Sequence, residues 1–338
     1  MPSPDGRPLI DINDGARSVP ADSGAPILFA LMREGVFLPS ACGGRASCGQ
    51  CRVRVLEGAG DHLPEEIALL TAEERARGIH LACQTRVTGD VRIAVPPHSL
   101  GARQHTARVA AIRDPVPGMR EVELALDDGM RFVAGQYVQL LIPGTERDPK
   151  PLYRAYSVTS SPRRTGLLSF LVGRVEGGAC STYIFERLRV GDGITLNGPF
   201  GEFRLHEGTG PALLVAGGSG IAPMRSILID VEERGITRPI TLFFVVRARR
   251  DLVWEAELRA FESRIPGFHF MPILSHPDPN DAWTGEKGGM ASVLARLVPR
   301  ADDAEACLCG APGMIESSIA ALRARGIAED RVFFDKFS

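Results

Sequence analysis

Four cysteines have a spacing that could do chemistry. Three of them, Cys42, Cys48 and Cys51, lie within ten positions in the stretch ACGGRASCGQCRV, and Cys83 follows after 31 intervening residues in HLACQT. Clustered thiols can form disulfides, bind zinc, act as a redox switch or hold an iron–sulfur centre. Three close ligands and one distant ligand favour a [2Fe-2S] cluster, because zinc sites usually show two matched pairs. Zinc and purely structural thiols remain the alternatives.

The glycines of this loop support the cluster interpretation. Gly43, Gly44 and Gly49 let backbone amides approach the sulfur atoms closely. The frame CGGxxSCGQCRV…LACQ resembles the ferredoxin domains of the plant-type, β-grasp group. It has five residues between the first two cysteines where the plant-type loop has four, and is closest to the F subunit of sodium-translocating NADH:quinone reductases. This resemblance implies that the metal ligands are Cys42, Cys48, Cys51 and Cys83.

A second group of candidate residues is RAYS, residues 154–157. An arginine can pair with a pyrophosphate, an aromatic ring can lie against an isoalloxazine, and a hydroxyl can meet flavin N5. The motif resembles the flavin motif of the ferredoxin reductase superfamily, which implies these roles for Arg154, Tyr156 and Ser157, with Ser157 as a catalytic residue. Taken alone it is a weak signal, because charged, aromatic and polar residues often share a strand.

The segment EGGACST, twenty residues later, strengthens the flavin interpretation. It precedes an apolar helical pattern, and exposed amides at the start of a helix form an anion site. Members of the superfamily place the FAD pyrophosphate there, and GPFGEF at 198–203 matches a turn that they carry after the barrel. The resemblance assigns FAD binding to Gly177, Gly178, Cys180, Ser181 and Thr182, with a small buried filler as the alternative role for Cys180.

A third motif, LLVAGGSGIAPM at 213–224, reads as a buried strand, a glycine loop and a helix. Gly217, Gly218 and Gly220 allow the backbone to approach a pyrophosphate, and Pro223 is tolerated in the first helical turn. A helix-capping turn without a ligand is the alternative. The loop resembles the GGxGxAP nicotinamide motif of the same superfamily.

CGAPGM at 309–314 resembles the second nicotinamide motif of that superfamily. The resemblance places Cys309 beside the nicotinamide ring as a catalytic residue. The C-terminal FFDKF resembles the ends of oxygenase reductases, so Phe337 is expected to cover the flavin and Asp335 to support Ser157 and Cys309 in catalysis. An aromatic strand end packed in the core is the alternative.

The nucleotide preference depends on the arginines in VVRARRDL. Arg247, Arg249 and Arg250 could bind an adenosine 2′-phosphate or could be solvated loop charges. NADH-using relatives also carry an arginine here. We therefore expect NADH with Arg247 near the nucleotide, and NADPH stays possible.

Three structural units are needed to position these motifs. Residues 1–97 show a hairpin around NDG, a helix over 25–35 capped by Asp22 or Ser23 and ended by Gly35, and a Thr71–Glu74 capping box. The resemblance makes this unit a β-grasp [2Fe-2S] ferredoxin domain, of mixed α+β class.

A Pro- and Gly-containing stretch predicts a linker at 98–104. Residues 105–207 then hold many short strands and one helical stretch at 181–188, which predicts an antiparallel six-stranded β-barrel, the FAD domain. From 208 to 338 strands and helices alternate, which predicts a parallel-sheet α/β domain for NAD(P)H.

Composition narrows the function classes. A formal net charge of −2 argues against a nucleic-acid partner, and 44% hydrophobic with 24% charged residues is typical of a globular protein. No apolar run approaches the ~18 residues of a membrane span, and the N-terminus lacks a signal-peptide pattern. We expect a cytoplasmic protein in which clustered cysteines do redox chemistry rather than form disulfides.

Taken together, the resemblance implies a reductase that carries electrons from NADH through FAD and a [2Fe-2S] cluster to a protein acceptor. The domain order matches reductase components of multicomponent oxygenases. It also matches the quinone reductase component named above, whose membrane-anchoring helix we do not expect here. A reductase for an oxygenase is the first expectation. The alternatives are reduction of a quinone, a separate ferredoxin or a corrinoid protein, a non-enzymatic carrier or sensor, and a zinc-binding adaptor.

Overall fold

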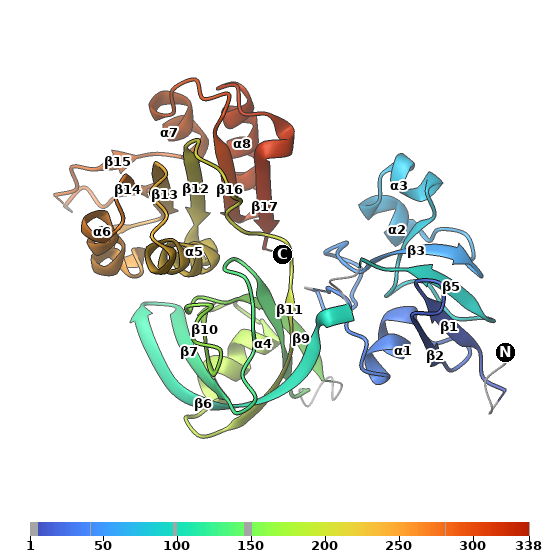
Figure 1. The fold of residues 1–338 in the computed structure, drawn as a ribbon. Coiled ribbons are helices and arrows are strands. Elements are labelled where there is room, and N and C mark those ends of the chain that lie inside the picture. Colours follow the sequence, from blue (N-terminus) through green and yellow to red (C-terminus); the bar gives the residue numbers. More distant parts are fainter. Residues whose placement is uncertain (1–5, 41, 97–99, 145–150, 281, 338) are drawn as a thin grey trace.

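The computed structural model describes residues 6–40, 42–96, 100–144, 151–280 and 282–337. Figure 1 shows three units that follow one another along the chain, each built around its own sheet. No helix among the described residues is long and apolar enough to cross a membrane.

The first unit is a mixed five-stranded sheet in the order β2-β1-β5-β3-β4. β1 pairs with β2 in an antiparallel hairpin and with β5 in parallel, as a β-grasp fold requires. The strands are β1 (Leu9–Ile12), β2 (Arg17–Pro20), β3 (Arg52–Glu57), β4 (Ile79–Leu81) and β5 (Val91–Ala94), and the helices are α1 (Ile27–Arg33), α2 (Pro64–Leu69) and α3 (Ala72–Ala76).

The start of α1 differs from the prediction. Neither Asp22 nor Ser23 caps it, because the helix begins later, after Pro26. Its first amides are satisfied across the fold instead: Ile27 donates to the Thr85 carbonyl and Leu28 to the Ala82 carbonyl. The C-terminal end at Gly35 (φ 72°) and the Thr71–Glu74 capping box are confirmed.

The second unit is a six-stranded antiparallel sheet in the order β10-β7-β6-β11-β8-β9. A bridge between Val158 and Phe170 joins its two edges, so the sheet closes into the predicted barrel. The predicted helix at 181–188 is a short α-turn followed by a π-turn. The elements are β6 (Arg103–Val116), β7 (Met119–Leu126), β8 (Tyr137–Ile142), β9 (Leu152–Ser157), β10 (Leu167–Gly173), α4 (Ala179–Thr182), η2 (Tyr183–Arg187) and β11 (Gly193–Phe200).

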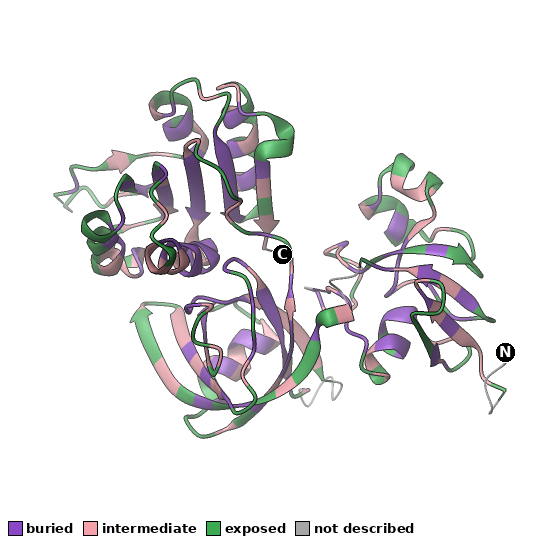
Figure 2. Ribbon diagram, in the orientation of Figure 1, coloured by how far each residue is buried: buried purple, intermediate pink, exposed green. Residues whose placement is uncertain are grey.

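The third unit is a parallel sheet in the order β15-β14-β13-β12-β16-β17. Its inner strands are buried on both faces (Figure 2), which explains their continuous apolar runs. The strands are β12 (Ala212–Gly217), β13 (Ile240–Val246), β14 (Phe268–Leu274), β15 (Glu286–Lys287), β16 (Glu305–Gly310) and β17 (Val332–Lys336).

Two separate cores cover this sheet, with α5 and α6 in one and α7 and α8 in the other. The helix predicted from Asp251 begins only at Glu255, because a 3₁₀ turn comes first and Trp254 has a left-handed backbone (φ 56°). The helices are α5 (Ile221–Arg234), α6 (Glu255–Arg264), α7 (Met290–Leu297) and α8 (Pro312–Arg323), with 3₁₀ turns η3 (Gly218–Gly220), η4 (Arg249–Asp251) and η5 (Glu329–Arg331).

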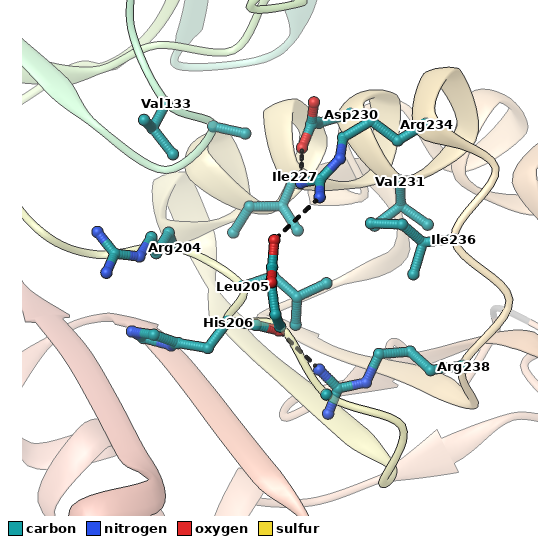
Figure 3. Close-up of a pocket in the computed structure, with 13 residues that line it drawn as sticks. Val133, Arg204, Leu205, His206, Ile227, Asp230, Val231, Arg234, Ile236 and Arg238 are labelled. Carbon is teal, nitrogen blue, oxygen red and sulfur yellow. Dashed lines mark hydrogen bonds and ion pairs between the residues drawn. The ribbon is translucent and has the colours of Figure 1, made fainter.

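The connections between the units are short. β6 begins at Arg103, inside the predicted linker, of which residues 98 and 99 lie outside the described part of the chain. The connection from the barrel to the parallel sheet is held by Arg238, which donates to the His206 carbonyl and to Glu305. A cavity of about 170 Å³ lies between this connection and α5 (Figure 3), and none of the predicted site residues lines it.

Candidate functional site

The four cysteines lie together as two contacting pairs. Cys48 donates to Cys42 across 3.4 Å, and Cys51 interacts in the same way with Cys83. All seven cysteines of the chain are free thiols. Within the described residues, no three histidine, cysteine, aspartate or glutamate side chains form a group suited to a single metal ion. Two pairs of thiols suit a centre with two metal atoms better than one zinc ion.

The loop around these thiols favours negative charge. The thiol of Cys48 and the backbone amides of Ser47, Cys48 and Arg45 lower the pKa of Cys42 to about 3. The Cys51 thiol, the Gln84 side chain and the Ala46 amide lower the pKa of Cys83 to about 7. Amide donors of this kind stabilise thiolates and the sulfides of a cluster. The positive φ of Gly43, Gly44 and Gly49 lets the backbone turn these amides inward.

A second site is a cavity of about 770 Å³ between the barrel and the C-terminal strand of the parallel sheet. It brings together nine of the predicted residues, from β9, the loop before α4, α4 itself and the end of the chain. These are Arg154, Tyr156, Ser157, Gly177, Gly178, Cys180, Ser181, Asp335 and Phe337.

β9 directs its RAYS residues into this cavity. The hydroxyl of Tyr156 lies 2.9 Å from the sulfur of Cys180, and burial raises the pKa of that thiol to about 11. Cys180 is therefore a neutral thiol, as expected for a buried filler. Arg154 reaches the cluster loop, where it donates to the Cys42 carbonyl at 3.3 Å. Burial, and the nearby guanidinium of Arg45, lower the pKa of Arg154.

The loop before α4 forms a tight backbone cradle. Gly177 has a φ of 68°, and a Cβ atom on Gly178 would lie 2.9 Å from the hydroxyl oxygen of Ser181. That hydroxyl accepts from the Val175 amide at 3.1 Å and so fixes the loop. Thr182 does not line the cavity. Phosphate oxygens need this kind of side-chain-free backbone approach.

The glycine loop after β12 lies where the parallel sheet reverses its strand order. β13 lies on one side of β12 and β16 on the other, so the carboxyl ends of β12 and β16 form a switch point. A Cβ on Gly217 would lie 2.5 Å from the Met314 sulfur, and a Cβ on Gly220 would overlap the Cys309 carbonyl oxygen. Both positions therefore require glycine. Gly218 adopts φ 53°, and Pro223 lies in the first turn of α5.

Cys309 is fully buried at the end of β16 and does not line the cavity. Its neighbour on β17 is Asp335, a register partner that faces the cavity. Burial, and then the charge of Asp335, raise the pKa of Cys309, and burial raises the pKa of Asp335 to about 6. A neutral thiol and a carboxyl that titrates near neutrality therefore lie side by side at the switch point.

The predicted nucleotide arginines lie away from both centres. Arg247, Arg249 and Arg250 are exposed at the carboxyl end of β13, and none of them lines the cavity. Arg250 lies 4.0 Å from Asp251.

The structure adds residues that the motifs did not indicate. Arg45 and Gln50 from the cluster loop, Tyr137 from β8, and Ser219 and Ala222 from the glycine loop all line the cavity. The glycine-loop pair could have been found, because both residues lie inside GGSGIAP. The other three have no sequence signal, since their position depends on how the first unit packs against the barrel.

Comparison with family models assigns each unit. A 2Fe-2S iron-sulfur cluster binding domain matches residues 10–88, an oxidoreductase FAD-binding domain residues 118–205, and an oxidoreductase NAD-binding domain residues 214–319. The F subunit of the Na(+)-translocating NADH-quinone reductase of Neisseria meningitidis is 31% identical over 366 residues, which cover 96% of this chain and 90% of that protein. The chain belongs to the flavin and iron–sulfur reductase family.

Solved structures share the whole arrangement of the reductase. The Amycolatopsis cytochrome P450 reductase GcoB has a TM-score of 0.81 and 32% identity, covering 98% of both chains. The ferredoxin reductase in carbazole 1,9a-dioxygenase has a TM-score of 0.76 and 26% identity, again over 98% of both chains. The Na(+)-translocating NADH-quinone reductase protein of Klebsiella pneumoniae is 31% identical over 372 residues, covering 97% of this chain and 91% of that one.

The family and the geometry agree. The reductase is an NAD(P)H-dependent FAD/[2Fe-2S] oxidoreductase that transfers electrons from the nicotinamide through the flavin to the cluster. The paired thiols suit the cluster, and the glycine cradle suits the flavin phosphates. The switch point of the parallel sheet suits a dinucleotide.

Proposed function

We propose that this reductase supplies electrons from NADH to the oxygenase component of a mono- or dioxygenase system. The observation that carries the proposal is the match over 98% of both chains to GcoB, described as a cytochrome P450 reductase, with a TM-score of 0.81. The similar match to the reductase of carbazole 1,9a-dioxygenase also supports it. The quinone reductase relatives support the alternative, in which the acceptor is a quinone.

The residue roles form part of the proposal. Two pairs of thiolates, Cys42 with Cys48 and Cys51 with Cys83, would hold the [2Fe-2S] cluster. Arg154, Tyr156 and Ser157 would bind FAD together with the cradle residues Gly177, Gly178, Cys180, Ser181 and Thr182, although Thr182 does not line the cavity. Gly217, Gly218, Gly220 and Pro223 would receive the dinucleotide, with Arg247 at its adenosine end.

When bound, FAD takes up an electron pair as hydride from NADH, and the cluster carries the electrons singly to the acceptor. The chain itself orients these groups. Ser157 would place its hydroxyl at the reactive edge of the flavin, and Asp335 would hold a proton near that edge and near Cys309. Phe337 would cover the nicotinamide-facing side and exclude water until the nucleotide binds.

NADH is proposed over NADPH. The quinone reductase relatives are described as NADH reductases. Arg247, Arg249 and Arg250 are exposed at the carboxyl end of β13, where solvation competes with the recognition of a 2′-phosphate. We also propose a cytoplasmic location, for which the seven free thiols are suited.

An anaerobic NADH titration of the purified protein tests the electron route. We expect the flavin absorption to bleach and a rhombic EPR signal of the one-electron-reduced cluster to develop, with NADPH reacting much more slowly. A colourless protein would indicate the zinc alternative. Cofactors that stay oxidised with NADH would indicate a carrier or sensor.

The choice of acceptor needs a second measurement. Steady-state NADH oxidation is compared with cytochrome c as a one-electron protein acceptor and with ubiquinone-1. The proposal expects faster turnover with cytochrome c, and loss of that turnover in the Cys83→Ser variant. Faster turnover with ubiquinone-1 would favour the quinone alternative.

A further inference from the structure

The cluster loop and the barrel are joined by a side-chain hydrogen bond. Tyr137, the first residue of β8, donates its hydroxyl to Oε1 of Gln50 across 3.0 Å. Gln50 lies directly before Cys51 in the chain, so this bond connects the barrel to a cluster ligand through one peptide unit. The bond therefore acts on the position of the cluster itself.

Apolar packing supports the same contact. The Tyr137 ring lies 5.6 Å from the ring of Phe200, and both belong to a small buried core with Phe37 of the first unit and Ala102. This core is separate from the main cores of the two units. Because the Tyr137 ring is buried, its hydroxyl has few orientations open to it and is aimed at the cluster loop.

Polar contacts bring the loop against the barrel a few residues away. The carbonyl oxygen of Cys42 accepts from Arg45 at 3.1 Å and from Arg154 of β9 at 3.3 Å. Gly43 lies so close to β9 that a Cβ atom would stand 2.8 Å from the Tyr153 carbonyl oxygen. The loop is therefore held on both sides of its three-cysteine segment, by Arg154 near Cys42 and by Tyr137 near Cys51.

We propose that Tyr137 and Gln50 are positioning residues that hold the cluster against the flavin cavity and thereby set the rate of flavin-to-cluster electron transfer. The proposal rests on the proposed function. Each NADH oxidised to NAD⁺ releases two electrons and one proton. The electrons cross this contact singly to the cluster and leave to two equivalents of a one-electron acceptor, and the proton goes to solvent. Neither residue exchanges a proton or an electron in this scheme.

The test uses the holoprotein mixed anaerobically with NADH. Stopped-flow absorption gives the rate of flavin reduction, and freeze-quench EPR gives the rate of cluster reduction. In Tyr137→Phe and in Gln50→Leu we expect the ratio of the cluster rate to the flavin rate to fall about three- to fivefold, the effect of losing one hydrogen bond from the docked arrangement. The midpoint potential of the cluster should stay unchanged, since neither substitution alters a charge.

A double-mutant cycle identifies the bond as the cause. If the two side chains act through each other, the double variant loses no more than either single variant. Gln136→Leu is the matched control, because Gln136 bonds only within the barrel, to the Val133 amide and the Gly201 carbonyl, in its described contacts. Its rate ratio should equal that of the wild type.

Three results separate the possible failures. Wild-type ratios in both single variants, with full FAD and iron content, would overturn the positioning role. Additive losses in the double variant would also overturn it, because each residue would then act alone. A wild-type protein whose cluster is not reduced by NADH would instead contradict the proposed function.

Discussion

Cys83 stands apart from the other proposed ligands in the sequence but lies against Cys51 in the fold. Replacing it by serine removes one thiolate of that pair and leaves the flavin cavity intact, since Cys83 does not line it. We expect Cys83→Ser to lose the cluster iron and its EPR signal while NADH still bleaches the flavin. Iron analysis and stopped-flow absorption measure the two effects separately. Loss of flavin reduction with FAD still bound would contradict separate transfer steps.

Ser157 lies at the end of β9, buried, with its side chain in the cavity. If its hydroxyl meets the reactive edge of the flavin, Ser157→Ala removes one oriented donor there. We expect flavin reduction by NADH to slow by about 10- to 100-fold, with the cluster content unchanged. The same variant of Ser160, which bonds within the barrel through the Leu167 carbonyl, is the control and should keep the wild-type rate.

Asp335 makes the stability of the reductase depend on pH. Burial raises its pKa to about 6 from an ordinary 3.8. Between these values the folded protein keeps a proton that the unfolded chain has released. The contribution of Asp335 to stability is therefore highest below the ordinary pKa and is lost as the pH rises through the folded pKa.

Asp335→Asn should remove this dependence. We expect the variant to gain thermal stability relative to the wild type on going from about pH 4.5 to about pH 7. Melting temperatures of both proteins at the two pH values measure the difference. An equal change in the two proteins would show that Asp335 is ionised in the folded state throughout this range.

The elements were predictable where their signal is local. Alternating and continuous apolar runs predicted the six barrel strands and the strand–helix alternation of the parallel sheet, because each pattern is carried by neighbouring residues. The start of α1 was predicted wrongly, because its amides are satisfied by carbonyls of Ala82 and Thr85, more than fifty residues away. Trp254 delays α6 through a left-handed backbone that nothing in its side chain announces.

The candidate site divides in the same way. The cysteine, RAYS and glycine motifs predicted residues that the fold gathers in two places. Tyr137, Gln50 and Arg45 were not predicted as contacts, because a contact between units depends on how they pack and leaves no periodic pattern. Cys309 was predicted beside the nicotinamide, and its full burial places other atoms over it.

The glycine loop after β12 gives a prediction at the level of the element. Because a Cβ atom on Gly220 would overlap the Cys309 carbonyl oxygen, Gly220→Ala must push α5 away from β16. We expect a loss of about 3 kcal/mol of stability and weaker NADH binding. Gly313→Ala is the matched control, since nothing lies within 4 Å of its Cβ position in the first turn of α8. Calorimetry of both variants decides whether the clash or the loss of glycine matters.

At the scale of the molecule, one ion pair fixes the connection between the barrel and the parallel sheet. The Arg238 and Glu305 side chains are 5% and 8% exposed and lie 3.1 Å apart, and Arg238 also donates to the carbonyls of Gly210 and His206. In Arg238→Met, Glu305 keeps only His206 as a charged neighbour among the described residues. We expect a loss of about 3–5 kcal/mol, measured by thermal unfolding.

An exposed pair supplies the comparison for that experiment. Arg300 and Asp302 lie 3.2 Å apart with side chains 81% and 63% exposed. Arg300→Met should change the stability by less than about 1 kcal/mol, because water screens the pair. Equal effects of the two substitutions would mean that burial does not strengthen the Arg238 contact.

The parallel pairing of β1 with β5 bears on the order in which the molecule is built. Ile10 pairs with Val91, so the first sheet closes only when the strand beyond Cys83 has been synthesised. Each unit is a continuous stretch of chain, and such units fold in the order in which they leave the ribosome. The flavin cavity gains Asp335 and Phe337 only with the last residues. Synthesis therefore completes the end of the electron route before its source, so a half-made chain can hold a cluster pocket but cannot yet accept a hydride.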